Sequence, residues 1–242
     1  IAGFPRTLAD GRLAVALPWV DGRRLRAEPD DLAALGRAVG ALHRALAVHP
    51  DRHAWQAATD RRLAELAAVR ADLAAGRLEA GPDPAALRRL AADPALDFAP
   101  AGLPRTPLHG DLNPGNVLVD PAGAVVLLDF EDVFHSVLPP RFELVLLIER
   151  HILLPVADDG AAAALIRALL AGYAAGGGPD GLLPVERPAD VLRSLALRAL
   201  CVLALGARSG LDGGASEWGK FLFLEERARA RAGLLERLLA GG

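Results

Sequence analysis

Apolar residues recur every three or four positions over most of the sequence after residue 29, and this spacing predicts a largely helical chain. The first apolar face carries Leu32, Leu35, Val39, Leu42 and Leu46. Asp30 or Asp31 stands just before this face, where an acidic side chain is expected to cap the helix. The same periodicity predicts helices over about 53–75, 83–92, 141–154, 159–175, 188–207 and 217–240. The proline-rich stretch 94–107 is expected to be a loop.

Two segments depart from the helical pattern. The short apolar runs 117–119 and 124–128 flank Asp120-Pro121-Ala122-Gly123, and proline followed by glycine in so short a connection predicts a β-hairpin. Because neither run alternates with polar residues, we expect both faces of this hairpin to be buried. A β-like run also spans 13–17, and 18–22 leads away from it as a connector.

Polar residues gather at the open end of the predicted hairpin. Asn116 enters the first strand and Asp129 follows the second, so an antiparallel pairing brings them close together. Both offer side-chain oxygen, the ligand type that Mg²⁺ prefers. Asp111 lies five residues upstream of Asn116, across a Pro-Gly loop that can fold back beside them. One carboxylate beside two oxygen ligands is the division of labour that phosphoryl transfer needs.

The run HGDLNPGNVLV at 109–119 resembles the aminoglycoside phosphotransferase and choline kinase-like superfamily. Similar likenesses are LGRAVGALH at 35–43, LDFED at 128–132 and, for the hinge between lobes, LPWVDG at 17–22. The resemblance spans about 13–148. It implies an α+β, protein-kinase-like fold in which residues 1–22 are the remnant of the N-terminal β lobe and hinge. Residues 23–242 are then the helical C-lobe that carries the catalytic loop, the metal site and the acceptor pocket.

The same resemblance implies a Mg²⁺-dependent kinase that moves the γ-phosphate of ATP (or GTP) to a hydroxyl of a small molecule. Asp111 corresponds to the catalytic base, and Asn116 and Asp129 to the metal ligands. The carbonyl of Pro18 and the amide of Val20 correspond to the groups that pair with the adenine edge. Leu118 corresponds to the apolar floor under the base.

Three departures from the family pattern bear on this expectation. Glu143 stands where the family usually has an aspartate that supports the catalytic loop, and whether the longer side chain keeps this support is open. Asn113 stands where protein kinases place a lysine. No Gly-rich phosphate loop or lysine precedes the hinge, and Lys220 lies near the far end of the chain. We therefore expect residues 1–242 alone to bind Mg-nucleotide weakly, and the reading frame upstream of Ile1 to decide whether a full kinase is encoded.

Composition excludes several other classes of protein. The net charge of −3 gives no footprint for nucleic acid. No apolar stretch is long enough for a membrane span and the N-terminus is not a signal peptide, so we expect a cytoplasmic protein with no membrane partner. Cys201 lies in an apolar run and is expected to be a buried packing thiol.

Two alternative functions stay open at this point. One is a degenerate kinase-like module that binds nucleotide or a partner without catalysis. The other is a metallohydrolase built on His109, Asp111 and Asp129, which needs further clustered ligands. His109 and His43 are expected to be packed or hydrogen-bonded rather than catalytic. Residues that either line an acceptor pocket or have ordinary core and surface roles are Trp55, His135, Glu149, His151, Glu217 and Trp218.

Overall fold

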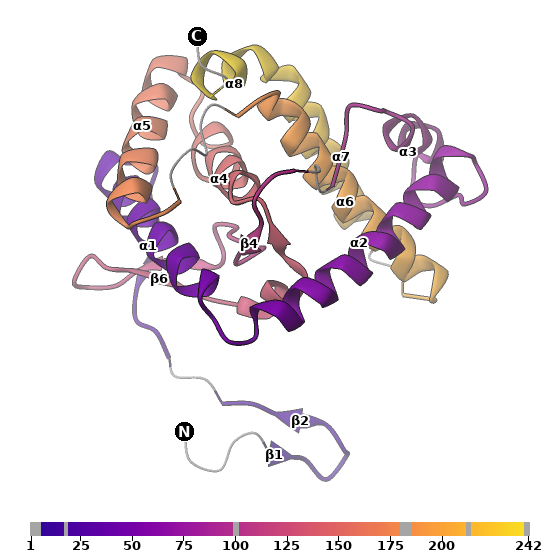
Figure 1. Cartoon of the computed structure of the whole chain (residues 1–242), viewed down its shortest axis with the longest axis horizontal. Coiled ribbons are helices and arrows are strands. Elements are labelled where there is room, and N and C mark those ends of the chain that lie inside the picture. Colours follow the sequence, from indigo (N-terminus) through magenta and orange to yellow (C-terminus); the bar gives the residue numbers. More distant parts are fainter. Residues whose placement is uncertain (1–5, 17–18, 99–101, 180–184, 212–213, 240–242) are drawn as a thin grey trace.

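The computed structural model describes residues 6–16, 19–98, 102–179, 185–211 and 214–239, and helices make up most of this part of the chain (Figure 1). The α-helices are α1 (Pro29–Ala47), α2 (Arg52–Ala74), α3 (Pro84–Ala91), α4 (Arg141–Leu147), α5 (Asp159–Ala175), α6 (Pro188–Arg208), α7 (Gly214–Ala230) and α8 (Ala232–Leu239). A 3-10 helix, η1, spans Phe130–His135, and a π-helix, η2, spans Ile148–Leu153. With the small sheets described below, the predicted mostly helical α+β class is confirmed.

Short antiparallel strands complete the fold. They are β1 (Arg6–Thr7) with β2 (Leu13–Ala14), β3 (Arg23–Arg24) with β5 (Val117–Val119), β5 with β6 (Val125–Leu127), and β4 (Thr106–Pro107) with β7 (Val137–Leu138). The predicted hairpin is confirmed as β5–β6, in which Val117 lies opposite Leu127. Its turn contains Gly123 at a φ of +84°, a conformation that favours glycine.

The hairpin is less buried than predicted. In β5 the side chains of Val117 and Val119 are buried and Leu118 is half-buried, while all of β6 is half-buried. The strands are apolar without alternation, yet one face lies against the helices and the other is partly open to solvent. The predicted loop 94–107 also ends in β4, which pairs with β7.

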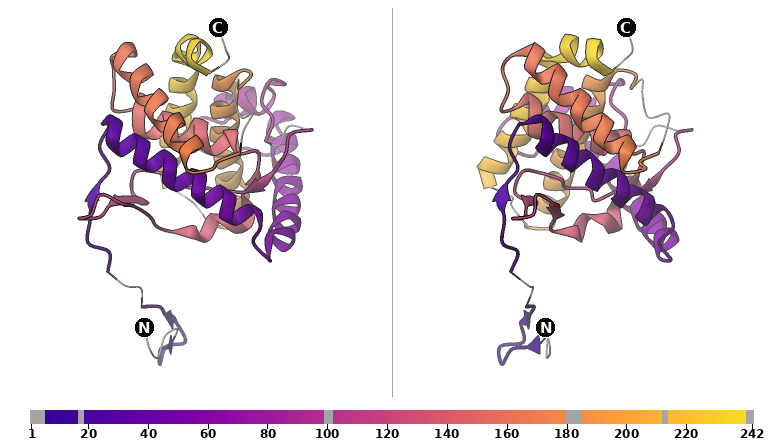
Figure 2. Two further views of the ribbon diagram at one scale, coloured as in Figure 1. Left: turned by 60° about the vertical axis from the view of Figure 1, so that its left-hand side comes forward. Right: turned by 90° about the vertical axis from the view of Figure 1, so that its left-hand side faces the viewer.

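The first described residues lie away from the helices. In Figures 1 and 2, the β1–β2 hairpin projects from the helical body, whereas β3 is joined to β5 within it. The β-like run predicted over 13–17 is thus only a two-residue strand among the residues that can be described. The division of the chain near residue 22 stays a prediction.

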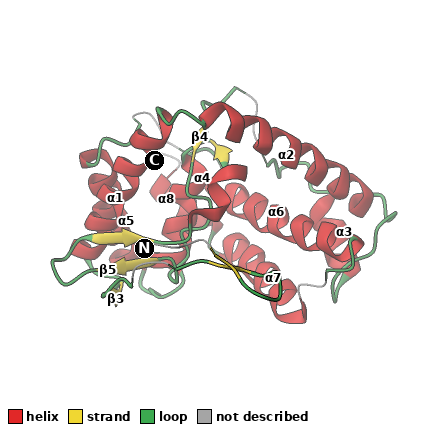
Figure 3. Cartoon of the chain, turned by 90° about the horizontal axis from the view of Figure 1, so that it is seen from below, coloured by secondary structure: helices red, strands yellow, loops and turns green. Residues whose placement is uncertain are grey.

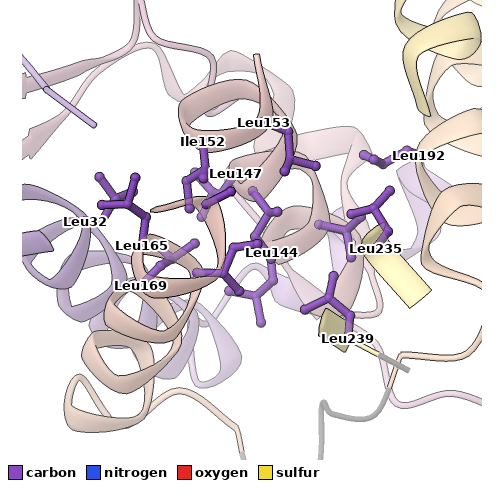
Figure 4. Close-up of a cluster of buried hydrophobic side chains, with 14 of the residues drawn as sticks. Leu32, Leu144, Leu147, Ile152, Leu153, Leu165, Leu169, Leu192, Leu235 and Leu239 are labelled. Atoms are coloured by element: carbon purple, nitrogen blue, oxygen red, sulfur yellow. The ribbon is translucent and has the colours of Figure 1, made fainter. Parts of the chain in front are cut away.

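The helices form two hydrophobic clusters that share α6. Figure 3 shows α1, α5 and α8 on one side of the molecule and α2, α3, α6 and α7 on the other. Leucines of α4, α5 and α8 fill the first cluster together with Leu32 and Leu192 (Figure 4). The second cluster holds Leu66, Leu197, Trp218 and Cys201. Burial raises the pKa of the Cys201 thiol to about 12, so it is a packing residue, as predicted.

Helices α1 and α5 approach each other through glycine, and Figure 2 shows them side by side. A Cβ on Gly36 would overlap the carbonyl oxygen of Leu169, and one on Gly172 would overlap that of Ala33. Gly40 and Gly176 repeat this close approach one turn further along. The sequence periodicity predicted both helices, and the glycines set how closely their backbones pack.

Three predicted helices differ in detail from the structure. Helix α1 begins after Glu28, so Asp30 and Asp31 lie in its first turn, and Asp31 instead accepts two hydrogen bonds from the guanidinium of Arg23 at 2.6 and 2.8 Å. The helix predicted over 141–154 changes from α to π at Ile148. The helix predicted over 217–240 is two helices that meet at Arg231. None of the described helices is long and apolar enough to cross a membrane.

Candidate functional site

Asp111 is held by two asparagine side chains of its own loop. The amide nitrogen of Asn113 donates to Asp111 Oδ2 at 2.8 Å, and that of Asn116 donates to the same oxygen at 3.2 Å and to the Asp111 carbonyl at 2.8 Å. No other described residue donates to the Asp111 side chain. One carboxylate oxygen is therefore oriented by protein, and the other, Oδ1, accepts no hydrogen bond from a described residue.

Asn113 shapes the loop as well as orienting Asp111. Its side-chain oxygen accepts a hydrogen bond from the Gly115 amide at 2.7 Å, the pattern of an Asx turn. The position where protein kinases have a lysine thus serves here to hold the carboxylate. This role was not anticipated from the sequence, although the spacing of Asn113 from Asp111 and Gly115 is the signal for it.

The hairpin brings Asp129 to the same end of the site as Asn116. The Leu128 amide donates to the Asn116 carbonyl at 2.9 Å, so Asp129 follows the residue that pairs with Asn116. Asp129 is exposed and has a left-handed backbone with a φ of 65°, which a non-glycine residue adopts at a cost of about 1–3 kcal/mol. No described residue donates to its carboxylate or to the Asn116 side-chain oxygen. Two side chains with oxygens that accept from no described donor therefore come from adjoining positions at one end of the hairpin.

The described part of the predicted hinge reaches β5 at Gly22. Pro18 falls outside the described residues. Val20 is half-buried, and β3 pairs Arg24 with Leu118. A Cβ on Gly22 would lie 3.3 Å from the Leu118 Cβ, so the chain after Val20 runs close along β5.

Glu143 supports the loop that carries Asp111 from the core side. Its Oε1 accepts the Gly110 amide at 2.7 Å, and its Oε2 accepts the His109 amide at 3.2 Å and a hydrogen bond from His43 Nε2 at 2.7 Å. The hydroxyl of Tyr173 lies 2.8 Å from the other ring nitrogen of His43. The question left open by the sequence is therefore answered: the longer glutamate side chain does reach the loop.

The charge of Glu143 is balanced within this network. Burial by itself would raise the pKa of Glu143, but the hydrogen bond and charge of His43 and the Gly110 amide outweigh it, so the pKa is lowered. An ionised carboxylate only accepts hydrogen bonds, so His43 Nε2 carries the proton between them. Both side chains are almost fully buried. The His-Gly-Asp turn thus rests on a buried carboxylate that His43 and two main-chain amides hold by hydrogen bonds.

Two further histidines fasten the loop to its surroundings. His109 is buried and donates from Nε2 to the Leu128 carbonyl at 2.8 Å, which ties the start of the loop to the end of β6. His151 donates from Nε2 to the Leu112 carbonyl at 3.0 Å, and burial lowers its pKa. Both histidines hold the loop in place, as expected for His109. His151 does so from η2.

A cleft with a volume of about 330 Å³ opens beside Asp111. Its lining includes Gly110, Asp111, Asp132, His135, Ser136, Glu149 and the cations Arg62, Arg150, Arg198 and Lys220. Lys220 lines this cleft although it lies near the far end of the chain. The cleft combines the free oxygen of Asp111 with a set of positive charges.

Of the residues considered for an acceptor pocket, two line this cleft: His135 and Glu149. His151 holds Leu112, as described above. Trp55 stacks on His49 with ring centroids 4.4 Å apart, and Trp218 is buried in the second hydrophobic cluster. Glu217 pairs with Lys220 at 3.3 Å. The structure therefore separates pocket residues from packing residues that the sequence could not tell apart.

The model of the phosphotransferase enzyme family, abbreviated APH, matches residues 3–182. The chain belongs to this family. Among solved structures it is similar to an aminoglycoside phosphotransferase from Alicyclobacillus acidocaldarius, with 17% identity and a TM-score of 0.41 over 91% of this chain and 70% of that one. No curated protein sequence matches the chain significantly. The superfamily inferred from the motifs at 109–119 and 128–132 is confirmed.

Proposed function

We propose that this member of the phosphotransferase enzyme family is a Mg²⁺-dependent kinase that moves the γ-phosphate of ATP (or GTP) to a hydroxyl of a small molecule. The observation that carries the proposal is the Asp111 carboxylate, with Oδ2 held by two asparagines and Oδ1 facing no described donor at the edge of the 330 Å³ cleft. Residues 23–242 supply this site, and residues 1–22 belong to the nucleotide-side lobe and hinge.

Asp111 acts as the base in this proposal. An acceptor hydroxyl in the cleft donates its proton to Oδ1 as its oxygen attacks the γ-phosphorus, and the bond to the β-phosphate oxygen breaks to release the nucleoside diphosphate. The hydrogen bonds to Oδ2 hold the carboxylate in one orientation before the acceptor arrives. Glu143 and His151 keep the loop in place from the core side.

Asn116 and Asp129 fit the requirements of the metal site. Each has a side-chain oxygen that no described residue occupies, one neutral and one charged, at adjoining positions of the hairpin end. Bound Mg²⁺ supplies neutralisation of the phosphate charge. The strained backbone of Asp129 supports a functional role, because such a conformation persists only where the surroundings enforce it.

The nucleotide base is proposed to lie over Leu118, with the Val20 amide and the Pro18 carbonyl at its edge. The half-buried state of Leu118 and the close passage of Gly22 along β5 support this position. An apolar floor beside one donor and one acceptor of the main chain suits a purine edge.

Phosphotransfer assays test the proposal directly. The enzyme expressed from its complete reading frame is incubated with γ-labelled ATP or GTP, Mg²⁺ and a panel of hydroxyl compounds, with Asp111→Asn as the matched inactive control. We expect transfer of label to at least one acceptor by the wild type only. Nucleotide binding with no transfer to any acceptor would favour the non-catalytic module instead. The metallohydrolase alternative finds no group of three metal-binding side chains among the described residues.

A further inference from the structure

Four cations from separate helices converge on the cleft beside Asp111. Arg62 comes from α2, Arg150 from η2, Arg198 from α6 and Lys220 from α7. The first and the last of them, Arg62 and Lys220, are 158 residues apart in the sequence, so no single sequence motif contains all four. The acids on the same lining are Asp111, Asp132 and Glu149.

Two of the cations have acidic partners one helical turn away. Arg62 pairs with Glu65 at 3.5 Å, and Lys220 pairs with Glu217 at 3.3 Å. The Lys220 side chain is 49% exposed. These two charges are largely satisfied by neighbours on their own helices and by water.

The other two cations are poorly balanced by protein. Arg198 donates to the His135 carbonyl at 2.7 Å, but among the described residues no carboxylate lies within 4.0 Å of its guanidinium. Burial lowers its pKa, as it does for a cation without a close counter-charge. The negative charge of Asp132 raises the pKa of Arg198, but by less than burial lowers it.

Arg150 is 15% exposed, and its Nε is buried without a hydrogen-bond partner among the described groups. The same atom lies 3.3 Å from Glu149 Oε2, so an ion pair exists without hydrogen-bond geometry. Burial raises the pKa of Glu149 to about 7, and this carboxyl is therefore only partly ionised at neutral pH. Glu149 therefore balances the Arg150 guanidinium less well than an ionised carboxylate that accepts a hydrogen bond from Nε would.

We propose that the acceptor alcohol carries an anionic group, a carboxylate or a phosphate, which Arg150 and Arg198 bind while its hydroxyl faces Asp111. This inference rests on the proposed phosphotransferase function and adds the chemical class of its acceptor. Guanidinium groups match the oxygen pairs of carboxylate and phosphate, and such a ligand adds negative charge beside two half-buried arginines that the protein balances poorly. A polycationic acceptor is repelled by the cations that line the cleft.

Matched acceptor pairs test the charge requirement. Purified enzyme is assayed with 4-hydroxybutyrate against 1,4-butanediol, with glucose 6-phosphate against glucose, and with kanamycin as the cationic arm. We expect kcat/KM to favour the anionic member of at least one pair by about tenfold or more, since a charge-assisted hydrogen bond contributes roughly 1.5–3 kcal/mol. The two pairs separate a carboxylate from a phosphate.

Arginine variants test the residues assigned to binding. Arg150→Gln and Arg198→Gln are expected to raise KM for the preferred anionic acceptor about 10- to 100-fold, with the KM for ATP unchanged. Arg198→Lys keeps the charge and should recover part of the loss. Arg208→Gln is the matched control, because Arg208 is on α6 like Arg198 but lies outside the cleft beside Asp72. Circular dichroism melts identify any variant that fails to fold.

Calorimetric binding keeps the inference testable apart from catalysis. With Mg·ADP present, the wild type should bind 4-hydroxybutyrate or glucose 6-phosphate more tightly than the neutral partner, and Arg150→Gln combined with Arg198→Gln should abolish the difference. Equal binding of anionic and neutral members, or best transfer to a neutral or cationic acceptor, overturns the inference and leaves the proposed function standing. Anion binding through the two arginines without any transfer overturns the proposed function but supports the anion-binding site.

Discussion

The Nε2 atom of His43 lies 2.7 Å from the Oε2 atom of Glu143, across 100 residues of sequence. This buried contact joins α1 to α4, and Glu143 in turn accepts the amides of His109 and Gly110. The turn that presents Asp111 is therefore positioned by the same pair that ties two core helices together.

Replacing Glu143 with glutamine should reduce both stability and turnover. Glu143→Gln keeps the shape but removes the charge opposite buried His43, and the free energy of unfolding should fall by about 3 kcal/mol. The comparison variant Tyr173→Phe removes only the hydroxyl on the far side of His43 and should cost about 1 kcal/mol. Urea denaturation measures the loss of stability in each of the two variants. Equal losses would mean that Glu143 contributes no more than an ordinary hydrogen bond.

Asp111→Asn should leave nucleotide affinity nearly intact while turnover collapses. Loss of a general base costs roughly 10²–10⁴ in rate. The matched variant is Asn113→Ala, which leaves the base in place but removes one hydrogen bond that orients it, and a loss of about tenfold or less is expected. Steady-state kinetics measure both variants. If Asp111→Asn stays within about twofold of wild type, the residue is not the base.

Asp129→Ala and Asn116→Ala should weaken Mg²⁺-dependent nucleotide binding, with the larger effect at Asp129 because it brings a full charge to the cation. Titration of Mg²⁺ at fixed nucleotide gives the metal dependence of each variant. Asp120→Ala, in the hairpin turn at the opposite end of β5, serves as the control for loss of a carboxylate. An Asp129→Ala variant with the metal dependence of wild type would remove this residue from the metal site.

Gly36→Ala should destabilise the protein by about 2–3 kcal/mol, because the added methyl group overlaps the Leu169 carbonyl and the α1–α5 pair must separate. Gly219→Ala is the matched control. No atom lies within 4 Å of a Cβ at this position of α7, so the change should stabilise the protein by about 0.5–1 kcal/mol. Thermal melts of the two variants should shift in opposite directions. A shift of the same sign in both would show that the close helix contact is not what requires Gly36.

The titration of Glu149 should make stability fall as pH rises. Its pKa is about 7 in the folded protein against 4.5 for the free side chain, so between these values the folded state holds a proton that the unfolded state has lost. Glu149→Gln removes this effect. Relative to wild type, the variant should gain about 2 kcal/mol on going from pH 5.5 to pH 8. Urea denaturation at the two pH values checks this, and a constant difference would mean that Glu149 does not titrate in this range.

The arrangement around Asp111, Asn116 and Asp129 was predictable because its contacts are local. A tight turn sets the register of β5 and β6, and that register brings the ends of the two strands together. The loop that carries Asp111 is only a few residues long, so the side chains of Asn113 and Asn116 stay within hydrogen-bonding reach of Asp111. Periodicity likewise located α5 at the observed residues, since it reports which face of a helix is buried.

Periodicity does not say which element covers a buried face, and there the tertiary structure decided. Whether Glu143 reaches the loop depends on how α4 is placed beneath it and on His43 from α1. The cleft cations come from helices separated by long stretches of chain, so Arg150 and Arg198 looked in the sequence like ordinary helix charges. Their place on one cleft arises only when packing brings η2 and α6 together, half-buries both guanidinium groups and leaves Arg198 without a carboxylate within 4.0 Å among the described residues, which is a property of the folded chain and not of any one segment.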